Sequence, residues 1–142
     1  MIVPRFVARL GPLLLLAACS GSAAPVPEPP GWLERPAEYA WGDTVASADN
    51  RLARHVHGAL RRTYGRPSET HYVARDAAAL RGLKDWYAAR IGDGWTPLPL
   101  PFLPPDRGFG FTDGRRALVF AWLPPQDDGG IPVTLFRFDA AG

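Results

Sequence analysis

Residues 109–122, FGFTDGRRALVFAW, decide the fold of this chain. The dipeptide Asp113-Gly114 separates two short runs of apolar residues, and both of its residues tolerate the positive φ of a type I′ turn. The stretch therefore predicts a β-hairpin with strands Phe109–Thr112 and Ala117–Trp122. Because neighbouring side chains of a strand point to opposite faces, the second strand has a bulky face and a small one. We expect the bulky face to meet the helices; it carries Leu118, Phe120 and Trp122.

Two amphipathic helices are predicted before the hairpin. Ala48–Tyr64 carries apolar residues on one face at helical spacing, and Ser47 is placed to cap its start. Ala77–Ile91 has one broad apolar stripe, and Asp76 is placed to cap it. Between the helices, the short alternating segment Thr70–Arg75 predicts a strand.

Two further strands are expected on either side of the hairpin. Trp95–Leu100 contains prolines that cannot donate to a ladder, so we expect it at an edge of the sheet. Residues 98–105, LPLPFLPP, are either a stiff connection there or a polyproline ligand for a partner. Val133–Phe138 is expected to pair as the last strand. Together these elements predict an α+β fold in two layers, with two helices on one face of an antiparallel sheet of about four strands.

Length and composition point to one globular domain. The chain has 142 residues, of which 46% are hydrophobic and 21% charged, as is usual for globular proteins. Cys19 is its one cysteine, so no intramolecular disulfide and no thiolate metal cluster can form. Without Arg5 and Arg9, which lie in a segment that we expect to be removed, the basic residues equal the 14 acidic ones in number. A neutral chain argues against nucleic acid as a partner, because that binding needs many cations.

The amino-terminal segment has the layout of an export signal. Arg5 and Arg9 precede the apolar stretch Leu10–Ala18, which is less than half of the roughly 20 residues that cross a bilayer as a helix. The stretch ends in Leu16-Ala17-Ala18-Cys19, which resembles the lipobox of bacterial lipoproteins. The alternative is an ordinary secretory signal with a chance cysteine near its cleavage site.

The resemblance to small envelope lipoproteins implies where the protein lives. It implies that Cys19 is lipidated and becomes the first residue of the mature chain, which anchors the protein to a membrane of the bacterial cell envelope. Ser20 stands where inner-membrane retention signals usually carry Asp, so the resemblance favours the periplasmic face of the outer membrane. We therefore divide the chain into a signal peptide (1–18), a lipidated cysteine with a Pro/Ala-rich tether (19–42), and a small α+β domain (43–142).

Four arginines of the first predicted helix fall within one arc of its circumference, away from the apolar face. Guanidinium groups match the geometry of phosphates and carboxylates, so the stripe is a candidate contact for anionic lipid headgroups or for an acidic envelope protein. The alternative is a solvated helix face. The members of the stripe are Arg51, Arg54, Arg61 and Arg62.

The sequence contains no motif that predicts catalysis, a metal site or a cofactor. His55 and His57 are two apart on a helix and point in different directions, so we interpret them as surface residues. His71 stands alone on a short predicted strand.

The function that these features predict is a non-enzymatic binding or structural module that contacts another envelope component. The alternative is a small enzyme or ligand carrier with a pocket between helix and sheet, using His71 or the aspartates as acid and base. A histidine and a carboxylate converging in a concave site would favour the alternative.

Overall fold

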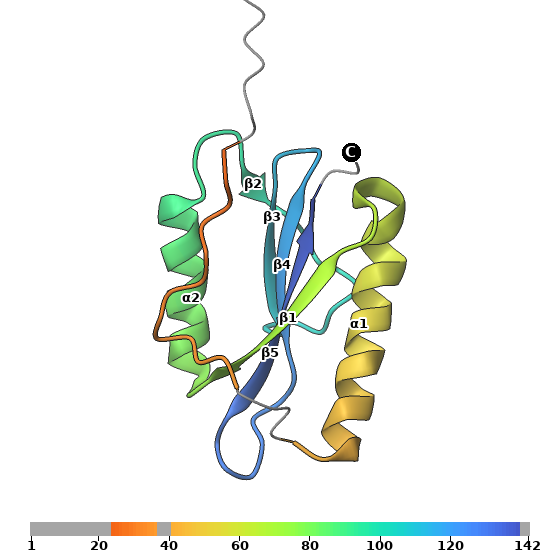
Figure 1. Ribbon diagram of the computed structural model, residues 1–142, viewed down its shortest axis with the longest axis vertical. Coiled ribbons are helices and arrows are strands. Elements are labelled where there is room, and N and C mark those ends of the chain that lie inside the picture. The colour runs from red at the N-terminus through yellow and green to blue at the C-terminus, as the bar shows by residue number, and fades with distance from the viewer. Residues whose placement is uncertain (1–23, 37–40, 140–142) are drawn as a thin grey trace, which may run out of the picture.

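The computed structural model describes residues 24–36 and 41–139. In this part of the chain two helices and five strands follow one another, and the strands form a single antiparallel sheet in the order β1-β5-β4-β3-β2 (Figure 1). The α+β class and the antiparallel sheet are as predicted. The elements are α1 (Asp43–Tyr64), β1 (Ser68–Ala74), α2 (Ala77–Arg90), β2 (Thr96–Pro97), β3 (Gly108–Thr112), β4 (Ala117–Trp122) and β5 (Ile131–Phe138).

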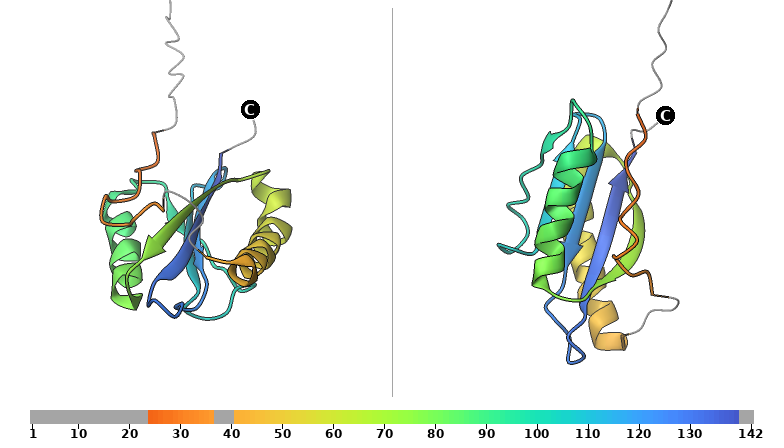
Figure 2. Two further views of the ribbon diagram at one scale, coloured as in Figure 1. Left: turned by 60° about the horizontal axis from the view of Figure 1, so that its bottom comes forward. Right: turned by 90° about the vertical axis from the view of Figure 1, so that its left-hand side faces the viewer.

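Apolar clusters lie on both faces of the sheet, and each face is covered by one helix (Figures 1 and 2). The cluster under α2 includes Leu83, Tyr87, Phe120 and Leu135. The cluster under α1 includes Val56, Leu60, Val119 and Phe136. The sheet is therefore the middle layer, which corrects the expectation that both helices lie on one face.

The reason is that β4 is buried on both sides. Its bulky face meets α2, as expected, but the small side chains of the opposite face are also apolar and buried. On that opposite face Val119 pairs with Phe136 and Ala117 with Phe138, so the combined surface of β4 and β5 is apolar enough to require a second covering helix.

The hairpin of β3 and β4 is confirmed, but its turn is not of type I′. Gly114 has a φ of 89°, whereas Asp113 keeps a negative φ. The Asp113 carboxylate instead accepts hydrogen bonds from the backbone N–H groups of Arg115 and Arg116, at 2.9 and 2.6 Å. The aspartate thus shapes the turn as an acceptor, the role that Asp commonly has in turns.

The helix starts differ in how well they were predicted. Asp76 caps α2 as expected, accepting a hydrogen bond from the Ala79 N–H at 2.8 Å. In contrast, α1 begins at Asp43, and its N-cap is Gly42 without a side-chain hydrogen bond, so Ser47 lies inside the helix. The negative charge of Asp43 in the first turn favours this earlier start, because the helix dipole is positive there.

Residues 24–36 pack against the domain, although we expected them to belong to a tether. They run beside α2 on the same face of the sheet, next to β1 and β5 (Figures 1 and 2). Leu33 is only 4% exposed within the cluster under α2, and Glu34 forms a β-bridge with Val73. Contacts with the domain thus extend to residues ahead of the predicted boundary at residue 43. Cys19 and the signal segment lie outside the described residues.

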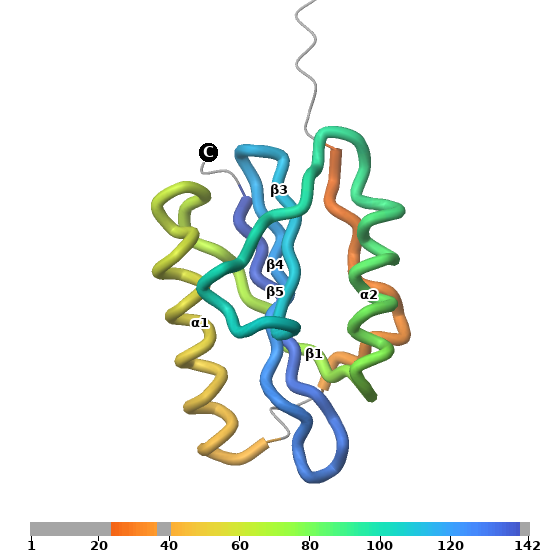
Figure 3. The backbone as a smooth tube through the Cα atoms, turned by 180° about the vertical axis from the view of Figure 1, so that it is seen from behind, coloured from red at the N-terminus to blue at the C-terminus, as the bar shows by residue number. Residues whose placement is uncertain are grey.

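The connection between β2 and β3 covers part of the other face. It passes from the edge of the sheet toward α1 (Figure 3), and Leu98, Leu100, Phe102 and Leu103 pack into the cluster under α1. Its prolines limit the ladder to the two residues of β2, which lies at the sheet edge as expected. The apolar side chains of this proline-rich stretch are thus used within the domain.

Candidate functional site

The predicted arginine stripe lies on the outer face of α1. Arg51, Arg54, Arg61 and Arg62 are all exposed, while Val56, Leu60 and Tyr64 of the same helix face the sheet. Arg61 and Arg62 occupy the last turn of the helix, where positive charge is favourable beside the negative end of the helix dipole.

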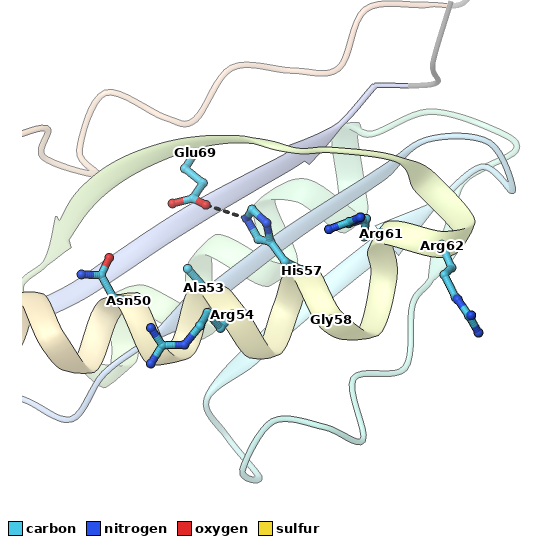
Figure 4. A pocket seen from close by; sticks show the side chains of 8 residues that line it. All are labelled: Asn50, Ala53, Arg54, His57, Gly58, Arg61, Arg62 and Glu69. Atoms are coloured by element: carbon cyan, nitrogen blue, oxygen red, sulfur yellow. Dashed lines mark hydrogen bonds and ion pairs between the residues drawn. The ribbon is translucent and has the colours of Figure 1, made fainter.

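A shallow hollow of about 710 Å³ opens between α1 and the beginning of β1 (Figure 4). Three of the four predicted arginines line it, and Arg51 does not. Figure 4 shows Arg61 beside His57, whereas Arg54 and Arg62 extend outward, so the arginines do not converge on one point. The hollow is lined by Asn50, Ala53, Arg54, His57, Gly58, Arg61, Arg62 and Glu69.

His57 and Glu69 meet in this hollow. The His57 Nε2 lies 2.6 Å from the Glu69 Oε1, and both side chains are about one-third exposed, at 34% and 31%. His57 is held edge-on to Phe136, with ring centroids 6.0 Å apart. A histidine paired with a carboxylate can accept or donate a proton. The sequence analysis interpreted His57 as a surface residue, and it missed the pairing because Glu69 lies on a different element.

A second polar cluster lies deeper between α1 and the sheet. The buried hydroxyl of Thr134 donates to Asp49 Oδ1 at 3.0 Å, and the Nδ1 of His71 lies 3.2 Å from Asp49 Oδ2. Thr134 is 2% exposed and Asp49 8%. A hydroxyl so enclosed cannot meet a substrate, so we interpret the cluster as a polar connection that positions α1. His71, which the sequence showed as isolated, is thus part of a network.

Within residues 24–36 and 41–139, no group of three or more His, Cys, Asp or Glu side chains could hold a metal ion. In the same ranges, neither α1 nor α2 combines the length and the apolar composition that a bilayer crossing needs. Comparison of the chain with protein-family models, with curated proteins and with solved structures finds no match.

Proposed function

We propose that the protein is a lipid-anchored lipoprotein of the bacterial envelope whose domain is a non-enzymatic binding module. The observation that carries this proposal is the segment Leu16-Ala17-Ala18-Cys19, placed directly after a short apolar stretch and two arginines. Two or three acyl chains on Cys19 give lasting attachment, because each buried methylene contributes about 0.8 kcal/mol. Since Ser20 follows the cysteine, the outer membrane is the favoured site, with the domain on its periplasmic face.

The proposed binding surface is the arginine stripe of α1. Its guanidinium groups are exposed and suit an anionic envelope component. The equal numbers of basic and acidic residues in the mature chain support a local contact rather than nucleic-acid binding.

The anchor is tested by expressing the full chain in a bacterial host as wild type, Cys19→Ser and Ser20→Ala. Intact mass spectrometry and membrane fractionation are the measurements. We expect wild type and Ser20→Ala to carry fatty acyl chains and to sediment with membranes, and Cys19→Ser to be unacylated and released. An unmodified thiol on wild-type Cys19, or an amino terminus downstream of it, would overturn the anchor. A Ser20→Asp variant tests the destination, and we expect it to move to the inner membrane.

The second candidate function is a small enzyme or ligand carrier that uses the hollow between α1 and β1. The observation that favours it is the meeting of His57 and Glu69 there, beside exposed arginines. Titration calorimetry with inorganic phosphate tests this candidate, with His57→Gln as the variant and His55→Gln, an exposed histidine on the same helix, as the control. Phosphate binding that His57→Gln loses and His55→Gln keeps would support it. An absence of binding to the wild type would remove it.

A further inference from the structure

The two ends of the domain carry opposite charge. The strand registers place the ends of α1 and α2, the turn between β3 and β4 and the end of β5 at one end of the molecule, and the starts of both helices at the other (Figure 1). The arginines at the first end are Arg61, Arg62, Arg66, Arg90, Arg115 and Arg116. The carboxylates in the same region are Glu69, Asp93, Asp113 and Asp139. The ion pair of Arg137 with Glu28 near the end of β5 adds no net charge. We call this the basic end.

The opposite end has the reverse balance. Its acidic side chains lie at the helix starts and in the connections beside them, and include Asp43, Asp76, Asp106, Asp127 and Asp128. Fewer basic residues lie there, namely Arg35, Arg75, Arg81 and Arg107. The domain is therefore electrically polar along its helices.

Most of the positive charge at the basic end is exposed. Of its arginines, only Arg116 forms an ion pair within the described residues, with Asp113 at 2.8 Å, and the others are exposed to solvent. Stabilisation of helix ends accounts for Arg61, Arg62 and Arg90, which lie in last turns. It does not account for Arg66 or Arg115, which lie in connections outside the helices.

Ala24, the first of the described residues, lies at the basic end. Arg116 donates a hydrogen bond from its Nη1 to the carbonyl of Ala24 at 2.9 Å, and from there residues 24–36 run to the bridge between Glu34 and Val73 at the acidic end. Five peptide steps separate Cys19 from Ala24, and a chain of that length spans at most about 18 Å. A lipid anchor on Cys19 therefore keeps Ala24, at the basic end, within roughly two Debye lengths of the anchored residue at physiological salt.

We propose that the basic end lies against an anionic phospholipid surface, so that the lipid-anchored domain stands with its helices pointing away from the membrane. The inference rests on the lipid anchor of the proposed function. Each arginine near an anionic bilayer strengthens binding about fivefold. The proposed orientation divides the arginine stripe into two parts, because Arg51 lies about 16 Å from Arg62 along the helix axis. Arg61 and Arg62 contact the headgroups in this arrangement, and Arg51 and Arg54 do not.

The experiment measures which end of α1 is nearer the bilayer. Thr44 and Thr63 are exposed at opposite ends of the helix, about 28 Å apart along its axis. Because the single natural cysteine is acylated, Thr44→Cys or Thr63→Cys accepts one fluorescent donor at a defined position. The lipidated full chain is reconstituted in vesicles that carry a headgroup-linked acceptor, with phosphatidylcholine alone or mixed with phosphatidylglycerol, and energy transfer is measured.

We expect phosphatidylglycerol to raise energy transfer from position 63 well above that from position 44, and salt to reverse the increase. The double variant Arg61→Glu/Arg62→Glu should abolish the difference, as should Arg66→Glu/Arg115→Glu, which changes no helix residue. The matched control Arg51→Glu/Arg54→Glu, with the same change in charge on the same helix, should keep it.

The results distinguish a failure of the proposed orientation from a failure of the lipid anchor on which it rests. Equal transfer from both positions in vesicle-bound protein, or equal effects of the 61/62 and 51/54 variants, would overturn the orientation and leave the anchor intact. Failure of the wild-type chain to acquire acyl chains or to stay with the vesicles would overturn the anchor itself.

Discussion

The hydroxyl of Tyr87 on α2 donates a hydrogen bond to the carbonyl of Pro27 at 3.0 Å. Burial raises the pKa of this hydroxyl above its ordinary value of 10.0, so it stays protonated and able to donate. Together with the ion pair of Arg137 and Glu28 at 3.0 Å, the bond ties the proline-rich segment to the core. Residues 24–36 thus belong to the folded unit.

Two neighbouring residues test how much this segment contributes to stability. We expect Leu33→Ala to lower the free energy of unfolding by about 2–4 kcal/mol, because it opens a cavity in the cluster under α2. Trp32 is 47% exposed, so Trp32→Ala should change the stability by less than about 1 kcal/mol. Urea denaturation followed by circular dichroism measures both. Equal losses would contradict the docking of the segment.

The buried contact between Asp49 and Thr134 should contribute measurably to the free energy of unfolding. Removing the carboxylate in Asp49→Ala takes away the acceptor that lies 3.0 Å from the buried Thr134 hydroxyl, and leaves only His71 Nδ1, at 3.2 Å, as a partner. We expect a loss of about 1–3 kcal/mol. The adjacent exposed Asn50→Ala is the control, and a double-mutant cycle with Thr134→Val isolates the interaction. A coupling energy of zero would show that the two side chains act independently.

The turn aspartate predicts a dependence of stability on pH. Burial alone would raise the pKa of the Asp113 carboxyl, but hydrogen bonds from Arg116 and Arg115 outweigh it and hold the pKa below the ordinary value of 3.8. A carboxyl whose pKa is lowered by folding stabilises the protein above its unfolded pKa, and this contribution is lost as the pH falls through the folded pKa.

We therefore expect Asp113→Asn to be less stable than the wild type by about 1 kcal/mol at neutral pH, with the difference shrinking at acid pH below 3.8. Thermal unfolding over a pH series measures the difference. Asp127→Asn, in the exposed connection before β5, serves as the reference. A difference that grows on acidification would have the wrong sign for this mechanism.

Two glycines should respond oppositely to alanine. A Cβ on Gly108 would lie 2.6 Å from Leu103 Cδ1 and 2.8 Å from the Phe120 carbonyl oxygen, so Gly108→Ala should destabilise the domain by about 1–3 kcal/mol. Gly82 lies inside α2 with open space around a Cβ, and Gly82→Ala should stabilise it by about 0.5–1 kcal/mol. Urea denaturation measures both changes in stability. An unchanged stability of Gly108→Ala would show that the connection between β2 and β3 shifts to make room for the added Cβ.

Local signals predicted the secondary structure well. Asp113-Gly114 between apolar runs located the hairpin, and Asp76 located the start of α2, because turns and caps depend on neighbouring residues. Local signals did not predict which face of the sheet each helix covers. Because the residues on one face of β4 are small, we expected no helix on that face. The aromatic residues that make it part of the core come from β5.

The polar contacts of the candidate site depend on the fold and not on local pattern. Glu69 reaches His57 only because β1 returns along α1, and Asp49 meets Thr134 across a separation of 85 residues. The arginine stripe could be predicted, since helical periodicity alone places its members on one face. Leu33 could not, because a single leucine among prolines has no periodicity that marks it as buried.

The course of residues 24–36 determines how the domain bears force. A pull on the chain ahead of Ala24, directed out of the basic end, acts along the docked segment rather than across it. The contacts of Pro27, Glu28 and Leu33 are then loaded together in shear, instead of breaking one after another as in peeling. Tension from an anchor would reach the sheet and α2 through several contacts at once.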